Sequence, residues 1–181
     1  MSERDDKAVI SIEEVRDFGL VTLKANFLDT KICDLVTATT GICFPKIGRI
    51  SIGKKLSVGW MSIDEIAIIL ADSEADKITQ KIKTKLKSYN NLCVNVSDSR
   101  CCFRLFGHGW REVLSKGTPI NLNPTSFTIG SFRRTRLGNV AVAIWAADID
   151  VAYLFSMYSV GSFVSDWLHM ANLRSGQLKY F

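Results

Sequence analysis

Residues 63–89, IDEIAIILADSEADKITQKIKTKLKSY, contain the two clearest structural patterns in this chain of 181 residues. The first eight residues, IDEIAIIL, are a dense apolar run rich in isoleucine, which favours a central β-strand over a helix. From Ser73 to Tyr89, apolar residues instead recur at steps of three and four, along one side of a helix. We therefore expect a buried strand that leads into an amphipathic helix, with Ser73 and Asp76 as a capping pattern at its start.

The segments upstream and downstream of this stretch continue the alternation of strands and helices. Leu20–Ala25 alternates apolar and polar side chains, as a half-buried strand does. Thr30–Thr40 has helical spacing, with Thr30 as the expected N-cap and Gly41 as the stop. The remaining expected elements are strands at 54–58 and 92–96. Residues 20–97 therefore follow the order β-α-β-β-α-β, which is that of a split βαβ or ferredoxin-like unit.

The second half of the sequence predicts a related unit with one more strand. Its expected elements are a strand at 101–106, a helix at 109–116, strands at 126–129, 133–137, 139–146 and 151–158, and a helix at 162–173. Since no linker separates the halves, we predict an α+β fold of two tandem split-βαβ units sharing one core. The expected divisions are an N-terminal arm at 1–19, mobile or an edge segment, one domain at 20–175, and a C-terminal tail at 176–181.

Composition excludes several classes of protein. Apolar residues make up 47% of the chain and charged residues 23%, which is typical of a globular domain. No uncharged apolar run approaches the roughly 18 residues that a membrane span needs, so no membrane association is expected. The first ten residues, MSERDDKAVI, lack the apolar segment of a secretion signal, and we expect a cytoplasmic protein. The five cysteines form no C-x-x-C pair and are expected to be free thiols.

The usual catalytic motifs are missing from the sequence. It contains no dinucleotide fingerprint, phosphate loop or nucleophile elbow. Asp64 and Glu65 are adjacent on a strand and should point to opposite faces, and Cys101 and Cys102 should do likewise, one facing in and one out. His108 has no evident catalytic partners, and His169 fits the end of a helix. We therefore assign no catalytic, cofactor-binding or metal-ligating residue.

Two groups of basic residues allow more than one interpretation. The lysines of the 73–89 helix form either a solvated face or a patch for an acidic partner; they are Lys77, Lys81, Lys83, Lys85 and Lys87. Arg133, Arg134 and Arg136 suit a protein interface or an internal ion pair. Nucleic-acid binding would need exposed aromatic residues beside them. We expect no nucleic-acid partner, because the aromatic residues Phe103, Phe106 and Trp145 are predicted to be buried.

A dispersed pattern over residues 56–172 resembles the gamma subunit of heterotetrameric sarcosine oxidase. The pattern comprises Asn95–Arg100 (NVSDSR), Arg104 through Pro119 to Leu122 (RLFGHGWREVLSKGTPINL), Phe127-x-x-Gly130-x-x-x-x-Thr135-Arg-Leu-Gly138, Trp145, Trp167-Leu168, and upstream Gly59-Trp60-x-x-x-Asp64-Glu65. That family is related to the aminomethyltransferase and folate-binding proteins, and the resemblance implies a fold similar to the folate-binding domain of aminomethyltransferase.

The resemblance implies a non-catalytic accessory subunit of an oxidoreductase complex active in sarcosine catabolism, with no active site in this chain. The alpha, beta and delta subunits would be its partners. They would carry FAD, FMN, NAD, zinc and tetrahydrofolate, and would oxidatively demethylate sarcosine or a related N-methyl amino acid. Tyr158–Gly161 (YSVG) stands where many members have R-S-F-A. A gamma-like subunit of N-methylglutamate dehydrogenase is therefore one alternative, and a free-standing folate-binding protein is another.

Overall fold

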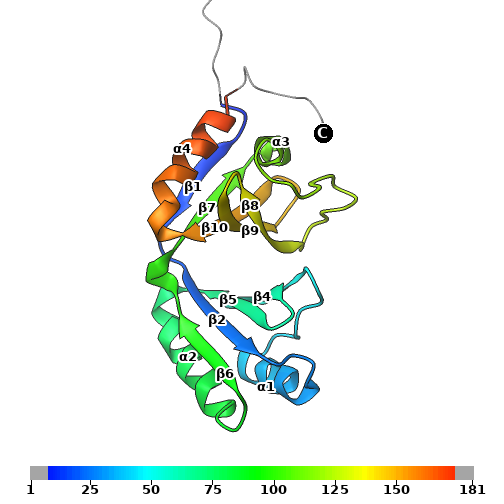
Figure 1. The fold of residues 1–181 in the computed structure, drawn as a ribbon, viewed down its shortest axis with the longest axis vertical. Helices are drawn as coiled ribbons and strands as arrows, with labels where there is room; N and C mark the ends of the chain where they lie inside the picture. Colours follow the sequence, from blue (N-terminus) through cyan, green and yellow to red (C-terminus); the bar gives the residue numbers. More distant parts are fainter. Residues whose placement is uncertain (1–7, 174–181) are drawn as a thin grey trace, which may run out of the picture. The chain divides into compact units, whose positions relative to one another are not determined.

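The computed structural model describes residues 8–173, which divide into two compact units (Figure 1). Unit 1 is formed by the two ends of the chain, up to residue 15 and from residue 101, and unit 2 by residues 16–100. Each unit contains one five-stranded sheet and two α-helices. The expected tail at 176–181, and residues 1–7 of the expected arm, lie outside the described residues.

Unit 2 has the split βαβ arrangement that its sequence predicts. Its elements are β2 (Gly19–Ala25), α1 (Thr30–Thr40), β3 (Ile50–Ile52), β4 (Leu56–Ser62), β5 (Glu65–Leu70), α2 (Asp72–Lys85), β6 (Asn91–Asn95) and the 3-10 turn η1 (Ser97–Ser99). The strand order is β3-β4-β5-β2-β6, and every neighbouring pair is antiparallel. The short edge strand β3 is an addition to the predicted elements.

The two helices of unit 2 begin differently from the prediction. Asp29, rather than Thr30, caps α1, and its carboxylate accepts a hydrogen bond from the Lys31 amide at 3.0 Å. At the other end Gly41 adopts φ 73°, as predicted for a helix stop. The capping pattern expected at Ser73 is wrong, because α2 starts at Asp72 and no side chain caps it.

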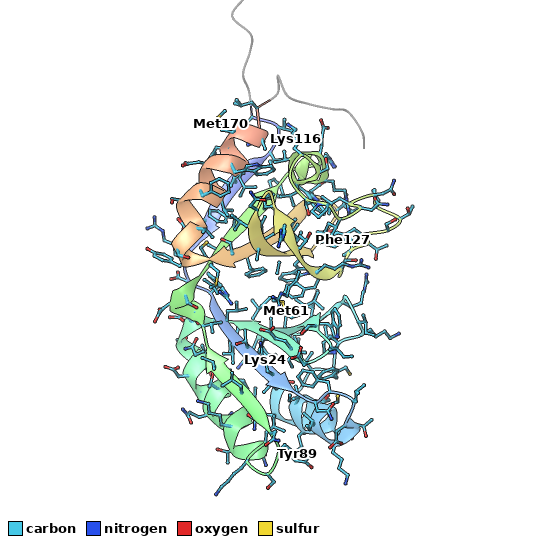
Figure 2. The ribbon with its side chains drawn as sticks, in the orientation of Figure 1. Lys24, Met61, Tyr89, Lys116, Phe127 and Met170 are labelled. Carbon is cyan, nitrogen blue, oxygen red and sulfur yellow. The ribbon has the colours of Figure 1, made fainter. Side chains whose placement is uncertain are left out.

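Unit 1 contains the second set of strands and helices. These are β1 (Ser11–Val15), β7 (Arg100–Phe106), α3 (Trp110–Ser115), β8 (Phe132–Leu137), β9 (Val140–Ala146), β10 (Val151–Met157), the 3-10 turn η2 (Tyr158–Val160) and α4 (Gly161–Ala171). The strand order is β1-β7-β10-β9-β8, so the part of the expected arm at Ser11–Val15 is an edge strand. The strand predicted at 126–129 is wrong: this segment is a loop, in which Phe127 is only 1% exposed (Figure 2).

Unit 1 repeats the topology of unit 2 with one strand taken from the other end of the chain. From one edge of the sheet to the other, the strand order is β3, β4, β5, β2, β6 in unit 2 and β8, β9, β10, β7, β1 in unit 1. The strand that should follow the second helix is thus β6 in unit 2, but β1, from the N-terminus, in unit 1. The second half therefore lacks the added strand that we predicted, because β8 corresponds to β3 of unit 2 and residues 126–129 form a loop.

Beneath the helices of each unit lies a cluster of buried apolar residues. In unit 2 the cluster joins alternate residues of β2 and β5 to the apolar stripe of α2, including Val21, Ile68 and Ile82. In unit 1 it joins β7, β9 and β10 to α3 and α4, around Trp110 and Leu154. Each sheet therefore buries one face under its own helices, as layer packing requires.

Candidate functional site

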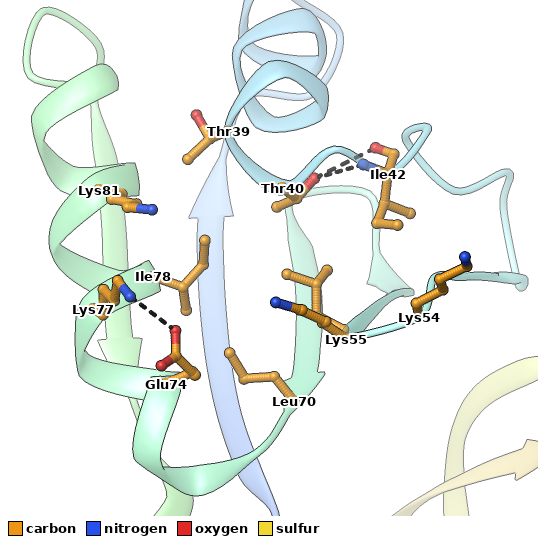
Figure 3. Close-up of a pocket in the computed structure, with 11 residues that line it drawn as sticks. Thr39, Thr40, Ile42, Lys54, Lys55, Leu70, Glu74, Lys77, Ile78 and Lys81 are labelled. Atoms are coloured by element: carbon orange, nitrogen blue, oxygen red, sulfur yellow. Dashed lines mark hydrogen bonds and ion pairs between the residues drawn. The ribbon is translucent and has the colours of Figure 1, made fainter.

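Unit 2 contains a cavity of about 350 Å³ between the end of α1, the turn from β3 to β4 and the first half of α2 (Figure 3). Its apolar wall includes Leu70 and Ile78, which are 8% and 7% exposed. Four lysines also line the cavity: Lys54, Lys55, Lys77 and Lys81. The sequence analysis identified Lys77 and Lys81 as part of the lysine face of α2 but did not connect them with Lys54 and Lys55.

The cavity is positively charged. Its only acidic lining residue, Glu74, lies 3.3 Å from the Lys77 amine in an i,i+3 ion pair whose side chains are both mostly exposed. Within residues 8–173, the side-chain amines of Lys54, Lys55 and Lys81 make no ion pair or hydrogen bond. Lys77 is paired with Glu74, and the amine of Lys54 points away from α2 (Figure 3), so Lys55 and Lys81 bring two uncompensated positive charges to this space. Such an arrangement attracts anions.

His108 contacts a carboxylate but belongs to a structural junction. Its Nδ1 pairs with Oδ1 of Asp150, and its side chain is 87% exposed. Beside it the Gly107 amide donates to the Asp150 carbonyl at 2.8 Å, and Trp110 Nε1 donates to the Ile149 carbonyl at 2.9 Å. These bonds join the start of α3 to the turn before β10. No hydroxyl or thiol nucleophile is among these contacts of His108.

The two adjacent carboxylates, Asp64 and Glu65, have separate surroundings. Asp64 is exposed and its carboxylate accepts a hydrogen bond from Ser62 Oγ at 2.6 Å. Glu65 is 8% exposed and lies 4.0 Å from the Lys24 amine. Each carboxylate thus has its own partner, and they do not form an acid–base pair.

Cys101 and Cys102 are both buried, at 4% and 2% exposure. The expectation that one would face outward is wrong, because both faces of β7 are covered at this point. Burial raises the pKa of each thiol, and the Cys101 Sγ lies 2.9 Å from Ser156 Oγ. Since the nucleophilic form of cysteine is the thiolate, both residues are structural.

The arginines of β8 lie on the surface, and none is paired directly with an aromatic residue of β9. Arg133, Arg134 and Arg136 are exposed, and Arg134 and Arg136 face the small residues Ala143 and Ala141 of β9. The prediction that Phe106 is buried is wrong: it ends β7 beside the edge strand β1, is 52% exposed and packs under Arg104.

The other two aromatic residues considered for nucleic-acid binding are covered to different degrees. Phe103 is 3% exposed, as predicted. Trp145 is partly buried. Its ring stacks on that of Tyr153, with the ring centroids 5.0 Å apart.

Sequence reasoning missed Arg111, a buried charged residue in the first turn of α3. Its side chain is 7% exposed, and Nη1 donates to the carbonyls of Leu122 and Phe127 at 2.7 and 2.9 Å. The guanidinium also lies 4.2 Å from the centre of the Trp110 ring. Arg111 therefore anchors the loop between α3 and β8, where a strand was predicted. An arginine next to the apolar residues of a short helix was the available signal.

The described part of the chain contains neither a cluster of metal ligands nor a helix that could span a membrane. Between residues 8 and 173, no group of three or more His, Cys, Asp or Glu side chains is placed to hold a metal ion. None of the described helices is long and apolar enough to cross a membrane.

Comparisons with solved structures identify two similar folds. A chain of the heterotetrameric sarcosine oxidase from Corynebacterium sp. U-96, solved in complex with pyrrole 2-carboxylate, matches with a TM-score of 0.82 at 21% identity, covering 90% of this chain and 83% of that chain. The glycine cleavage system aminomethyltransferase T from Bartonella henselae matches with a TM-score of 0.66 at 10% identity, covering 90% of this chain and 46% of that chain. At these identities the likeness shows a shared α+β fold.

Two comparisons of sequence complete the assignment. No curated protein matches this chain. The family described as "Sarcosine oxidase, gamma subunit family" matches residues 25–173, which is most of the chain and covers parts of both units. The chain therefore belongs to the sarcosine oxidase gamma subunit family.

Proposed function

We propose that this chain is the non-catalytic gamma subunit of a heterotetrameric, sarcosine-oxidase-like flavoenzyme. The complex would oxidatively demethylate sarcosine or a related N-methyl amino acid. Membership of the gamma subunit family over residues 25–173 carries this proposal. The likeness in fold to a chain of a heterotetrameric sarcosine oxidase supports it.

The surface of unit 1 is consistent with a role as a subunit. Phe163 and Met170, seven residues apart on α4, are 49% and 71% exposed, and Tyr158 just before the helix is 67% exposed. Met170 is labelled in Figure 2. Residues seven apart share one side of a helix. A soluble monomer usually hides such groups, whereas a subunit covers them with its partners. We propose that the large subunits cover this side of α4.

The chemistry would reside on the partners. Under this proposal the alpha, beta and delta subunits carry FAD, FMN, NAD, zinc and the tetrahydrofolate that receives the one-carbon unit. The cytoplasm is the proposed compartment, and the five cysteines, all free in the structure, agree with reducing conditions. This chain would contribute surface and stability to the complex.

Co-expression with candidate alpha, beta and delta subunits tests the proposal. We expect one complex that contains all four chains in equal number, binds flavin and oxidises an N-methyl amino acid. The control omits this chain, and the partners should then assemble poorly or lose activity. The proposal is wrong if the partners form an active complex without this chain while this chain elutes alone.

The same preparation separates the alternatives left open by the sequence. Turnover of sarcosine against N-methylglutamate distinguishes sarcosine oxidase from N-methylglutamate dehydrogenase. Calorimetry of the isolated chain with tetrahydrofolate tests the free-standing folate-binding protein, which predicts binding without any partner.

A further inference from the structure

We propose that the lysine-lined cavity of unit 2 binds a small organic anion with an apolar body and two or more carboxylate or phosphate groups. This inference goes beyond the proposed function, because it concerns a site within this chain and does not require the complex. It rests on the shape of the cavity, on the lysines around it and on the absence of side-chain partners for Lys55 and Lys81 among residues 8–173.

The lysines approach the cavity from two sides. Lys55 comes from the turn between β3 and β4 and its amine points toward α2, whereas Lys77 and Lys81 point from α2 toward β4 (Figure 3). Amines that converge on one space can contact one multivalent anion together. Lysines of a solvated helix face, such as Lys83 and Lys87, are exposed but do not line the cavity.

The protein itself does not neutralise these charges. Glu74 pairs with Lys77 alone, and in the described residues the side-chain amines of Lys55 and Lys81 neither form an ion pair nor donate to a carbonyl. A bound anion would supply the opposite charge that the described residues do not provide to Lys55 and Lys81.

The hydroxyl groups in the lining leave the lysines as the main donors. Thr39 Oγ1 donates to the Leu35 carbonyl at 2.6 Å, and Thr40 Oγ1 donates to the Val36 carbonyl at 2.8 Å. Both hydroxyl protons are therefore used within α1. A ligand that fits must present acceptor groups, which carboxylates and phosphates do.

The apolar wall distinguishes a small organic anion from an acidic peptide. Leu70 and Ile78 are buried residues that face a volume of about 350 Å³, near the lower end of the usual range for small-molecule sites. An acidic peptide is instead suited to an open lysine face, where it has no apolar body to bury. We therefore infer a compact ligand whose ring or hydrocarbon part lies against this wall.

Calorimetry on the full chain tests the inference with two matched probes. Benzene-1,2,4-tricarboxylate and citrate both carry three carboxylates, but only the first has an aromatic ring. We expect the ring compound to bind at least fivefold more tightly than citrate. The double variant Lys55→Ala/Lys81→Ala should weaken binding of the ring compound at least tenfold. The control Lys83→Ala/Lys87→Ala also removes two positive charges, one within α2 and one just after its end, but neither lysine lines the cavity. It should change binding less than twofold.

Because all four lysines are exposed, both double variants should keep the circular dichroism spectrum and unfolding midpoint of the wild type. Equal losses in the two double variants would show general electrostatic attraction and overturn the inference. Citrate binding as tightly as the ring compound would overturn it too, as would no binding at millimolar concentration. A glutamate-rich peptide that binds more tightly than the ring compound would identify a docking site for an acidic segment and would also overturn it. The outcome is independent of whether partner subunits assemble.

Discussion

Asn172, at the C-terminal end of α4, holds the backbone of Ile10 through both its amide and its carbonyl. Its Oδ1 accepts a hydrogen bond from the Ile10 amide at 2.8 Å, and its Nδ2 donates to the Ile10 carbonyl at 2.8 Å. The same Oδ1 accepts from the Val9 amide at 3.0 Å. β1 begins at Ser11, directly after Ile10. In unit 2 the chain itself connects the second helix, α2, to the edge strand β6; in unit 1 the Asn172 side chain connects the end of α4 to the edge strand β1.

Asn172→Ala should therefore loosen β1 from unit 1. Asn172 and Ile10 are each 5% exposed, so the substitution leaves buried backbone groups without partners. We expect a loss of about 3 kcal/mol in the free energy of unfolding, with early hydrogen exchange along β1. His169→Ala, at an exposed position on the same helix, should cost less than about 0.5 kcal/mol. Equal stability of the two variants would show that Asn172 does not hold the strand.

Local patterns predicted the elements whose partners are close in sequence. The run from Ile63 to Leu70 and the stripe from Ala75 to Leu86 predicted β5 and α2, because the periodicity reflects which side of each element is buried. The pairing of β1 with β7 could not be inferred in this way. It joins residues as distant in sequence as Val15 and Cys102, and β1 itself has mixed charges and few apolar residues.

Arg111→Met should release the loop between α3 and β8. The methionine keeps the apolar stem but leaves the buried carbonyls of Leu122 and Phe127 without a donor. We expect a destabilisation of about 3 kcal/mol and faster proteolytic cleavage in residues 117–131. Arg133→Met, at an exposed position on β8, is the matched control and should leave both measurements near the wild type. Unchanged cleavage in Arg111→Met would contradict the anchoring role.

The candidate site shows the same limit of sequence reasoning. The helical spacing placed Lys77 and Lys81 on α2, but Lys55 lies in a turn whose position depends on the tertiary fold. Phe127 illustrates the opposite error: its apolar neighbourhood resembled a strand, while its burial comes from a loop fixed by Arg111. Alternation of apolar and polar residues indicates which side chains are buried, but it does not show whether the backbone is a strand. A buried loop residue such as Phe127 can therefore be mistaken for part of a strand.

Gly117→Ala should destabilise unit 1 through contact with one aromatic ring. A Cβ at position 117 would lie 2.3 Å from Cζ2 of Trp167, closer than atoms can approach without movement. We expect a cost of about 2 kcal/mol, measured by chemical unfolding. In a Trp167→Ala background the space is open, so adding Gly117→Ala should cost less than about 0.5 kcal/mol. Additive costs in the double variant would place the strain elsewhere.

Cys93 should make stability depend on pH in the alkaline range. It is 1% exposed in the core of unit 2, and burial raises the pKa of its thiol from 9.0 to about 11. Because the folded chain holds the neutral thiol, its contribution is fully present below pH 9 and is lost as pH rises toward 11, where the unfolded chain ionises first.

The measurement compares the wild type with Cys93→Ala. Alanine has no ionisable group, so the packing that this variant loses lowers its stability by the same amount at every pH. The difference in unfolding free energy between them should shrink by about 1.4 kcal/mol from pH 8 to pH 10, one pKa unit being worth about 1.36 kcal/mol. A thiol reagent applied to the native protein should label the exposed Cys43 and spare Cys93. A pH-independent difference, or rapid labelling of Cys93, would mean that its thiol is not held in the core.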